Sequence, residues 1–109
     1  MLIGLTLSLT TLAVQADVHV IRSTIHGNGY TTTGNTISII SPTITLNGQK
    51  LELHTGEINA RNACEILGLN YVSYDQGISN NTNRARIDEN GSIEFIEGSR
   101  YLSVLNCRK

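Results

Sequence analysis

The sequence predicts an α+β protein, with a mainly antiparallel sheet or small barrel of about seven strands, one helix packed on it and one disulfide. Three observations lead to this prediction. Short runs of β-branched and apolar residues are separated by Gly- and Asn-containing turns, as in antiparallel sheets. One segment, residues 57–69, has helical spacing instead. The chain contains two cysteines, Cys64 and Cys107, which can form one pair.

The N-terminal segment, residues 1–16, resembles a secretory signal peptide in composition. The run from Leu2 to Val14 carries no charge and is mostly Leu, Ile, Val and Thr. It is shorter than the roughly 20 apolar residues of a membrane span and fits a signal h-region of about 7–15 residues. No Lys or Arg precedes this run, and a buried N-terminal strand or helix is the alternative. We expect cleavage after Ala16, which leaves residues 17–109 as a single secreted or periplasmic globular domain.

The charge balance limits the classes of partner. The chain has 109 residues and a formal net charge of −1. Nucleic acids and anionic membranes are bound by an excess of Lys and Arg, which release counterions, and this chain has no such excess. We therefore expect no nucleic-acid partner. As a separate expectation, the mature chain contains no membrane span. A protein or another cell-envelope component is the expected partner.

The two cysteines predict a structural disulfide. In an oxidising compartment an even cysteine count indicates disulfide bonding, and Cys64 and Cys107 allow one pairing. A zinc site is disfavoured because structural zinc needs four ligands and no CxxC or HxxxH spacing is present. A catalytic cysteine stays open, because the sequence does not show whether a His base lies nearby.

The first half of the domain reads as strands joined by turns. Residues 18–25 and 36–40 are apolar and β-branched and predict strands, whereas the Gly-, Asn- and Thr-rich residues 26–35 predict a loop. Residues 43–53 predict a hairpin, since Asn47-Gly48 is the pair that a two-residue type I′ turn requires.

The register of this hairpin follows from its turn. Leu46 is then opposite Gln49, Ile44 is opposite Leu51, and Thr43 is opposite Glu52. The apolar residues share one face of the hairpin in this register, which supports it.

Residues 57–69 predict the helix. An apolar stripe runs along it at positions i, i+3, i+4 and i+7, formed by Ala60, Ala63, Cys64 and Leu67. Gly68 is placed to end the helix in a left-handed conformation. The stripe turns Cys64 inward, where a bond to Cys107 would attach the helix to the last strand.

The second half predicts a short strand over 71–74, a mobile loop over 75–83, a hairpin over 84–97 and a last strand over 100–107. In the hairpin, a three-residue loop over 89–91 sets Arg86 opposite Glu94, a better pairing than a two-residue turn allows. In the last strand, alternation places Leu102 and Leu105 on opposite faces.

A metal site would form at the new N-terminus if cleavage follows Ala16. The mature chain would then begin Asp17-Val18-His19. The α-amine of Asp17, two backbone amides and the imidazole of His19 supply four nitrogens in one plane, the geometry that Cu(II) and Ni(II) prefer. No other cofactor is expected.

The motifs of common hydrolases and nucleotide-binding proteins, such as GxSxG, HExxH and a phosphate-binding loop, do not occur. The sequence therefore favours a small exported binding or interaction protein without catalytic activity. We expect binding on the loop side of the sheet, through Tyr30, Tyr74, Asn80 and Asn81.

Two alternatives come from other functional classes. His54 could act as a general base together with a carboxylate, which would make the protein a small extracytoplasmic hydrolase. The protein could instead be a secreted enzyme inhibitor that presents loop 75–83 to its target.

Overall fold

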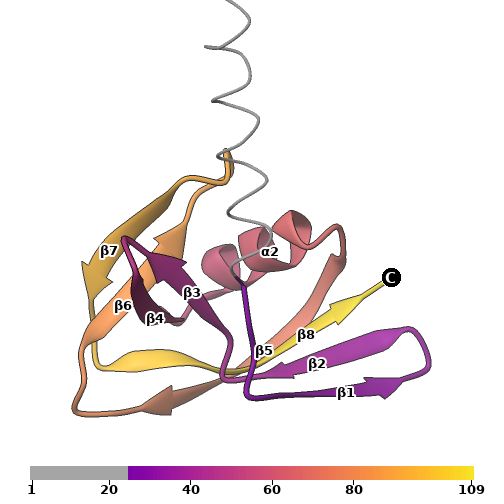
Figure 1. Cartoon of the computed structure of the whole chain (residues 1–109). Helices are drawn as coiled ribbons and strands as arrows, with labels where there is room; N and C mark the ends of the chain where they lie inside the picture. Colours follow the sequence, from indigo (N-terminus) through magenta and orange to yellow (C-terminus); the bar gives the residue numbers. More distant parts are fainter. Residues whose placement is uncertain (1–24) are drawn as a thin grey trace, which may run out of the picture.

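A computed structural model describes residues 25–109 and contains eight strands and one helix (Figure 1). The elements are β1 (Gly29–Thr33), β2 (Thr36–Ile40), β3 (Thr43–Leu46), β4 (Gln49–Leu53), α2 (Glu57–Ile66), β5 (Asn70–Ile78), β6 (Asn83–Ile87), β7 (Ile93–Glu97) and β8 (Arg100–Arg108). The predicted signal peptide and all but the last residue of the predicted strand over 18–25 lie outside the described residues.

The strands form two sheets of four. The first sheet has the order β1-β2-β8-β5 and is antiparallel throughout, and the second has the order β3-β4-β6-β7. In the second sheet β4 and β6 are parallel, since the connection between them crosses through α2 and β5. The fold is therefore α+β, mainly antiparallel, with one helix in the described part of the chain. The described strands do not close into a barrel.

Both predicted hairpins are confirmed with their registers. Across β3 and β4, Leu46 pairs with Gln49 and Ile44 with Leu51. Asn47 and Gly48 have φ values of 51° and 79°, as a type I′ turn requires. Across β6 and β7, Arg86 pairs with Glu94, and the Gly91 N–H donates to the Asp88 carbonyl at 3.0 Å.

The prediction of a loop over residues 26–35 is wrong. Residues 29–33 form β1, which pairs with β2 along its whole length. The turn signal belongs only to Gly34-Asn35, where Gly34 has a φ of 60°. Three consecutive threonines precede this turn, and their β-branched side chains favour extended backbone even beside several glycines.

The predicted loop over residues 75–83 is also wrong, because residues 75–78 continue β5 and Asn83 begins β6. The nine-residue strand β8 provides hydrogen-bonding partners as far as the pair Ile78 and Arg100. Tertiary pairing thus imposes extended structure on a segment without strand periodicity. Only residues 79–82 remain outside strands.

Bulges change the faces of β5 and β8. Asp75 pairs with Val104 and Gln76 pairs with Leu102, so β8 has one extra residue at Ser103. Leu102 and Leu105 are consequently both fully buried, which corrects the predicted placement on opposite faces. A second bulge lies at Val72, between the pairs Tyr71–Cys107 and Ser73–Asn106.

The core lies between the two sheets and α2. Its fully buried side chains include Ile44, Leu53, Leu102 and Leu105. The predicted helix stripe is confirmed, since Ala60, Ala63 and Cys64 are buried and Leu67 packs against the core. The helix ends as expected at Gly68, whose φ is 77°, with the Leu69 N–H donating to the Cys64 carbonyl. The predicted disulfide joins Cys64 to Cys107 and ties α2 to β8.

Two buried asparagines on α2 dock the helix onto β6. Asn59 donates to the carbonyls of His54 and Ala85 and accepts from the Ile87 N–H at 2.8 Å. Asn62 donates to the Ile87 carbonyl at 2.8 Å. The strand β4 pairs with β6 only as far as Ala85. These side-chain amides therefore satisfy the N–H and C=O groups of Ile87, which β4 does not reach.

Candidate functional site

The residues predicted to bind a partner do not form one surface. Tyr30 and Tyr74 lie in the same cross-strand row, at opposite edges of the first sheet, with Ile39 and Leu105 between them. This row faces the core; Tyr30 is 58% exposed, whereas Tyr74 is half-buried.

Asn80 and Asn81 are exposed on the short connection between β5 and β6. That connection lies beside the start of β8, where the Ser79 N–H donates to the Ser99 carbonyl. The row that contains Tyr30 crosses β8 at Leu105, away from the start of that strand. Tyr30 therefore lies in a different part of the sheet from Asn80 and Asn81.

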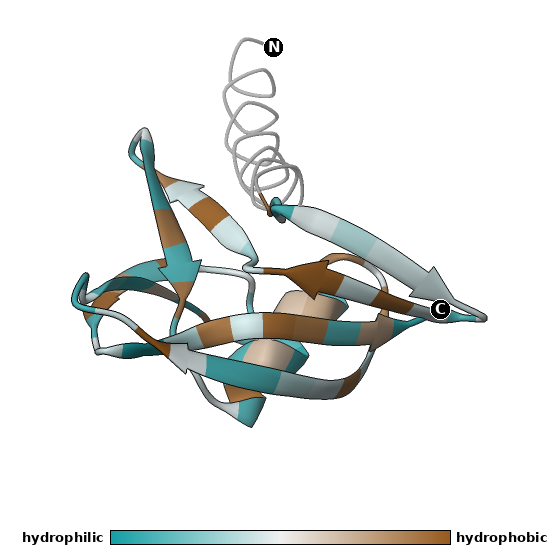
Figure 2. Cartoon of the chain, turned by 90° about the horizontal axis from the view of Figure 1, so that it is seen from below, coloured by the Kyte–Doolittle hydropathy of each residue, from teal (hydrophilic) through white to brown (hydrophobic). Residues whose placement is uncertain are grey.

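In the part of the chain that the structure describes, the opposite face of the first sheet is open. The helix α2 covers the face that carries Cys107 (Figure 1). Figure 2 views the other face, here called the outer face, from below, and no described element lies over it. One row of short polar side chains crosses all four strands of this face, in the order Thr31, Ser38, Asn106 and Ser73. We call these four residues the polar row.

Three members of the polar row, Ser38, Asn106 and Ser73, are joined by hydrogen bonds that run in one direction. The Ser38 hydroxyl donates to Asn106 Oδ1 at 2.5 Å, and Asn106 Nδ2 donates to Ser73 Oγ at 2.9 Å. The Ser73 hydroxyl hydrogen, the second Nδ2 hydrogen and the second Oδ1 lone pair of Asn106 stay available. Because each bond polarises the next, Ser73 becomes a stronger donor than an isolated serine. The row can therefore both donate to and accept from a ligand laid across it.

The neighbouring rows differ in character. On one side Ile40 and Val104 form a half-buried apolar strip that ends at Asp75. On the other side Thr36 pairs with the exposed Arg108. The outer face is thus uncharged at its centre, with opposite charges on either side of the polar row.

His54 lies beside a hollow of about 480 Å³ at the start of α2. The lining residues are His54, Thr55, Gly56, Glu57, Ile58, Asn59 and Arg86. The polar groups there have partners: His54 Nδ1 lies 2.8 Å from the Thr55 carbonyl oxygen, and Arg86 Nε donates to Glu94 at 2.6 Å. His54 and Glu57 line the same hollow, and in the described part of the chain no ion pair joins His54 to a carboxylate.

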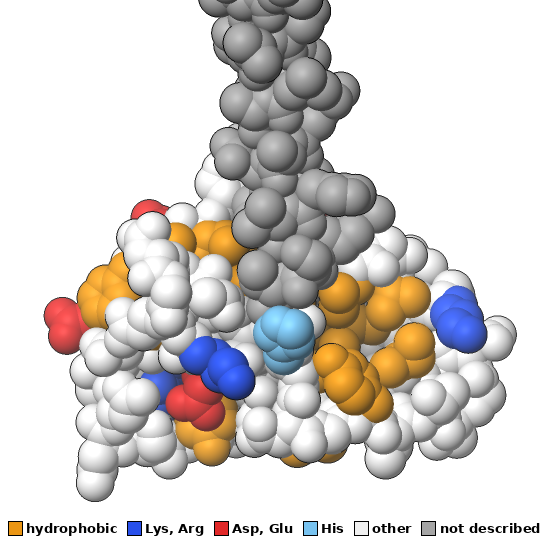
Figure 3. Space-filling model, in the orientation of Figure 1, with side chains coloured by type: hydrophobic (Ala, Val, Ile, Leu, Met, Phe, Trp, Pro, Cys, Tyr) orange, Lys and Arg blue, Asp and Glu red, His pale blue; other side chains and the backbone are white. Residues whose placement is uncertain are grey.

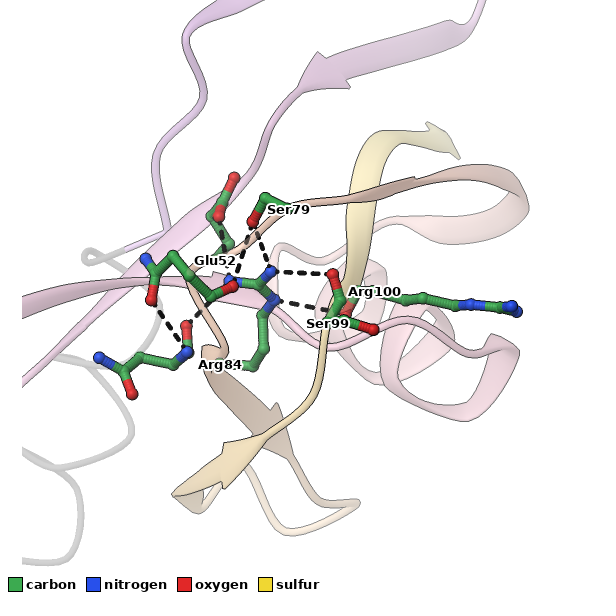
Figure 4. Close-up of polar contacts among 7 residues, drawn as sticks. Glu52, Ser79, Arg84, Ser99 and Arg100 are labelled. Carbon is green, nitrogen blue, oxygen red and sulfur yellow. Dashed lines mark hydrogen bonds and ion pairs between the residues drawn. The ribbon is translucent and has the colours of Figure 1, made fainter.

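Arg84, whose polar contacts are drawn in Figure 4, is the one fully buried charged side chain within residues 25–109. Its guanidinium lies over the ring of Tyr101. All five of its N–H donors can be used, on the acceptors Glu52 Oε1, Ser79 Oγ and the carbonyls of Asn83, Ser99 and Arg100. With no donor left over, Arg84 acts as a structural link between β6, β4 and the start of β8.

Two shifted pKa values belong to the helix side of the first sheet. Burial raises the pKa of Tyr71 above its ordinary value, and Glu57 adds to the effect. A hydrogen bond to Glu57 raises the pKa of Arg61, whose guanidinium lies 4.7 Å from the centre of the Tyr71 ring. Neither group reaches the outer face.

The predicted copper or nickel ligands, Asp17, Val18 and His19, lie outside the described residues. Between residues 25 and 109, no three His, Cys, Asp or Glu side chains converge as metal ligands. No helix in that range has the length and apolar character needed to span a bilayer.

Sequence reasoning did not single out Ser38, Ser73 or Asn106. Alternation within β2 and β8 could have placed Ser38 and Asn106 on solvent faces. Their alignment with Ser73 depends on the bulge at Val72, for which the sequence carries no signal.

The chain matches no protein-family model, and no curated protein or solved structure shows significant similarity to it.

Proposed function

We propose that this chain is a small exported binding protein, without catalytic activity of its own, that holds a polysaccharide of the cell envelope on the outer face of its first sheet. The observation behind this proposal is the polar row, an ordered line of hydroxyl and amide groups across four strands. Its members are held by a rigid sheet, so little side-chain entropy is lost when a ligand binds.

Export to the periplasm or the exterior is supported by the buried disulfide between Cys64 and Cys107. Disulfides persist in oxidising compartments and are rare in the cytosol. The apolar segment before Ala16 provides the expected signal peptide.

The chemistry of the outer face favours a neutral, hydroxyl-rich ligand. Ser73 and Asn106 can each donate and accept, which matches a sugar hydroxyl that does both. The apolar strip of Ile40 and Val104 offers a place for the C–H face of a sugar ring. A protein partner is less well matched, because the cores of protein interfaces are enriched in aromatic residues and the polar row contains none.

Co-sedimentation with insoluble polysaccharides tests this proposal. The oxidised protein is incubated with purified peptidoglycan, chitin or cellulose, and the bound fraction is measured over a range of protein concentrations. We expect Asn106→Ala and Ser73→Ala to weaken binding about 3- to 10-fold, the effect of one lost hydrogen bond. Asn80→Ala, a change of an exposed amide away from the outer face, is the matched control and should bind like the wild type.

Three results would contradict the proposal. The binding surface is wrong if no polysaccharide retains the protein, or if Asn80→Ala and Asn106→Ala weaken binding equally. Release of soluble sugar that disappears in His54→Ala would show catalysis and favour the hydrolase alternative.

A further inference from the structure

Within residues 25–109, the outer edge of β1 has no strand beside it. In the described chain, β1 is a terminal strand of the first sheet and pairs only with β2. Thr33 and Thr36 flank a two-residue turn and therefore form a hydrogen-bonded pair. Counting back from Thr33, every second residue of β1 bonds to β2 through its backbone N–H and C=O groups. The backbone N–H and C=O groups of Tyr30 and Thr32 consequently point away from the sheet.

The other three edge strands carry features that discourage pairing with another chain. The β5 edge has a bulge at Val72 and a charge at Asp75, and β7 carries Glu94 and Glu97. The four-residue strand β3 follows Pro42 and approaches β7. Bulges, charges, prolines and short strands are the usual protections of a sheet edge.

The β1 strand has none of these protections. Its sequence, GYTTT, contains no charge and no proline, and its register with β2 is continuous. Figure 3 shows that charged side chains are sparse over β1 and β2 and gather mainly on the side of the second sheet.

We propose that β1 pairs with β1 of a second copy of this chain, antiparallel, about a two-fold axis at Thr31. In this register Tyr30 is opposite the partner's Thr32, and Thr32 is opposite the partner's Tyr30. The outward groups of these residues form two hydrogen-bonded pairs. Thr31 faces the partner's Thr31 in the closer, non-hydrogen-bonded position between them.

The symmetry of β1 favours a second copy over a foreign strand. The residues with outward backbone groups, Tyr30 and Thr32, are placed evenly on either side of Thr31, so the edge is complementary to itself. Thr opposite Thr and an aromatic residue opposite Thr are favourable cross-strand pairs. With no charge on β1 and a net charge of −1 on the chain, two copies approach without strong repulsion.

The dimer would also extend the polar row. Thr31 is the end of that row on the outer face, and in the proposed register it meets the partner's Thr31 directly. The two rows then form one line across eight strands. The dimer therefore deepens the proposed function by doubling the surface for a long polymer, although strand pairing itself does not require a polysaccharide.

Charge reversal at Thr31 tests the register. In Thr31→Lys and in Thr31→Glu, two like charges would meet at the two-fold axis, so each variant should be monomeric in sedimentation velocity experiments. An equimolar mixture should restore the dimer, because Lys then faces Glu. Thr33→Lys, on the same strand and the same face, would lie opposite the partner's Gly29 and should dimerise like the wild type.

Thr32→Pro tests the hydrogen bonds. Proline removes an N–H that points away from β2, so no bond within the chain is lost, and proline is tolerated at sheet edges. We expect this variant to be monomeric with an intact disulfide, whereas Thr32→Val, which keeps the N–H, should still dimerise.

The inference is wrong if the wild type stays monomeric as its concentration rises, or if the mixed Lys and Glu variants do not associate. Capture of an added extended peptide by monomeric wild type would assign the edge to a foreign strand instead. Polysaccharide binding by a monomeric wild type would reject the dimer alone, and a dimer that binds no polysaccharide would reject the proposed function alone.

Discussion

The guanidinium of Arg84 donates to Oε1 of Glu52 at 3.2 Å, and these two residues are also register partners in the parallel pairing of β4 with β6. The Arg84 side chain is 0% exposed and that of Glu52 is 28% exposed. The charge pair thus lies at the short junction that joins the two halves of the second sheet. Because the remaining donors of Arg84 bond to Ser79, Asn83, Ser99 and Arg100, loss of this side chain would loosen several connections at once.

Arg84→Met should therefore lower the free energy of unfolding much more than Arg86→Met does. Removing one partner of a buried ion pair costs about 3–5 kcal/mol of unfolding free energy, whereas exposed pairs contribute about 0.2–1 kcal/mol. Arg86 is the matched control because it lies on the same strand and pairs with Glu94, with both side chains more than half exposed. Urea denaturation of both variants measures the difference, and equal losses would show that the Arg84 cluster contributes little.

Gly77→Ala should disturb the packing of Tyr101 against Arg84 and lower the free energy of unfolding. A Cβ at Gly77 would lie 2.7 Å from Cζ and 2.8 Å from Oη of Tyr101. The ring cannot yield freely, because the guanidinium of Arg84 lies 5.1 Å from its centre. Overpacking of this kind costs about 1–3 kcal/mol.

Gly29→Ala is the control for this substitution, since its new Cβ would have only ordinary contact, 3.9 Å from Ile40 Cγ1. Both variants are compared with the wild type in thermal and urea unfolding. If Gly77→Ala and Gly29→Ala unfold at the same midpoint, the packing of Tyr101 against Gly77 is not restrictive.

The two hairpins and the helix could be predicted because their signals are local. Asn47-Gly48 fixes both the turn and the register of one hairpin, and the helix stripe directs Cys64 inward. The disulfide then followed from a count of two cysteines. In each of these segments the turn chemistry, the alternation and the burial agree.

The elements that could not be predicted depend on distant strands. Residues 75–78 are extended because β8 lies beside them, and the polar row aligns only because Val72 bulges. In the sequence, Arg84 resembles an arginine on the solvent face of a strand. In the fold, β4 and the start of β8 enclose its side chain. The candidate site was missed for this reason, since its residues come from the β1–β2 hairpin and from β5 and β8, which lie far from that hairpin in the sequence.

Reduction of the disulfide should lower the unfolding free energy by about 4 kcal/mol, the chain-entropy value for the loop closed by residues 43 positions apart. The bond links α2 to β8, so its loss should also loosen the helix. Urea unfolding with and without reductant measures the change in the wild type. The double variant Cys64→Ala and Cys107→Ala should be no more stable than the reduced protein, and it should not respond to reductant.

The mature protein should bind Cu(II) if export removes residues 1–16. Four nitrogens from Asp17, Val18 and His19 would then give a visible d–d absorption band on titration with copper. His19→Ala should lack this band, and retention of one additional N-terminal residue should abolish it in the wild type. Identical spectra from wild type and His19→Ala would exclude the site.

Ionisation of Tyr71 should lower the free energy of unfolding as the solution becomes alkaline. Burial raises the pKa of Tyr71 above its ordinary value of 10.0, so the unfolded chain loses this proton at a lower pH than the folded one. The contribution of Tyr71 to stability is therefore complete below pH 10.0 and is lost as the pH rises through its folded pKa. Tyr71→Phe cannot ionise, and its unfolding free energy should fall less steeply between about pH 9 and about pH 11. Urea unfolding across this range measures both slopes, and parallel slopes would mean that Tyr71 titrates alike in the folded and unfolded chains.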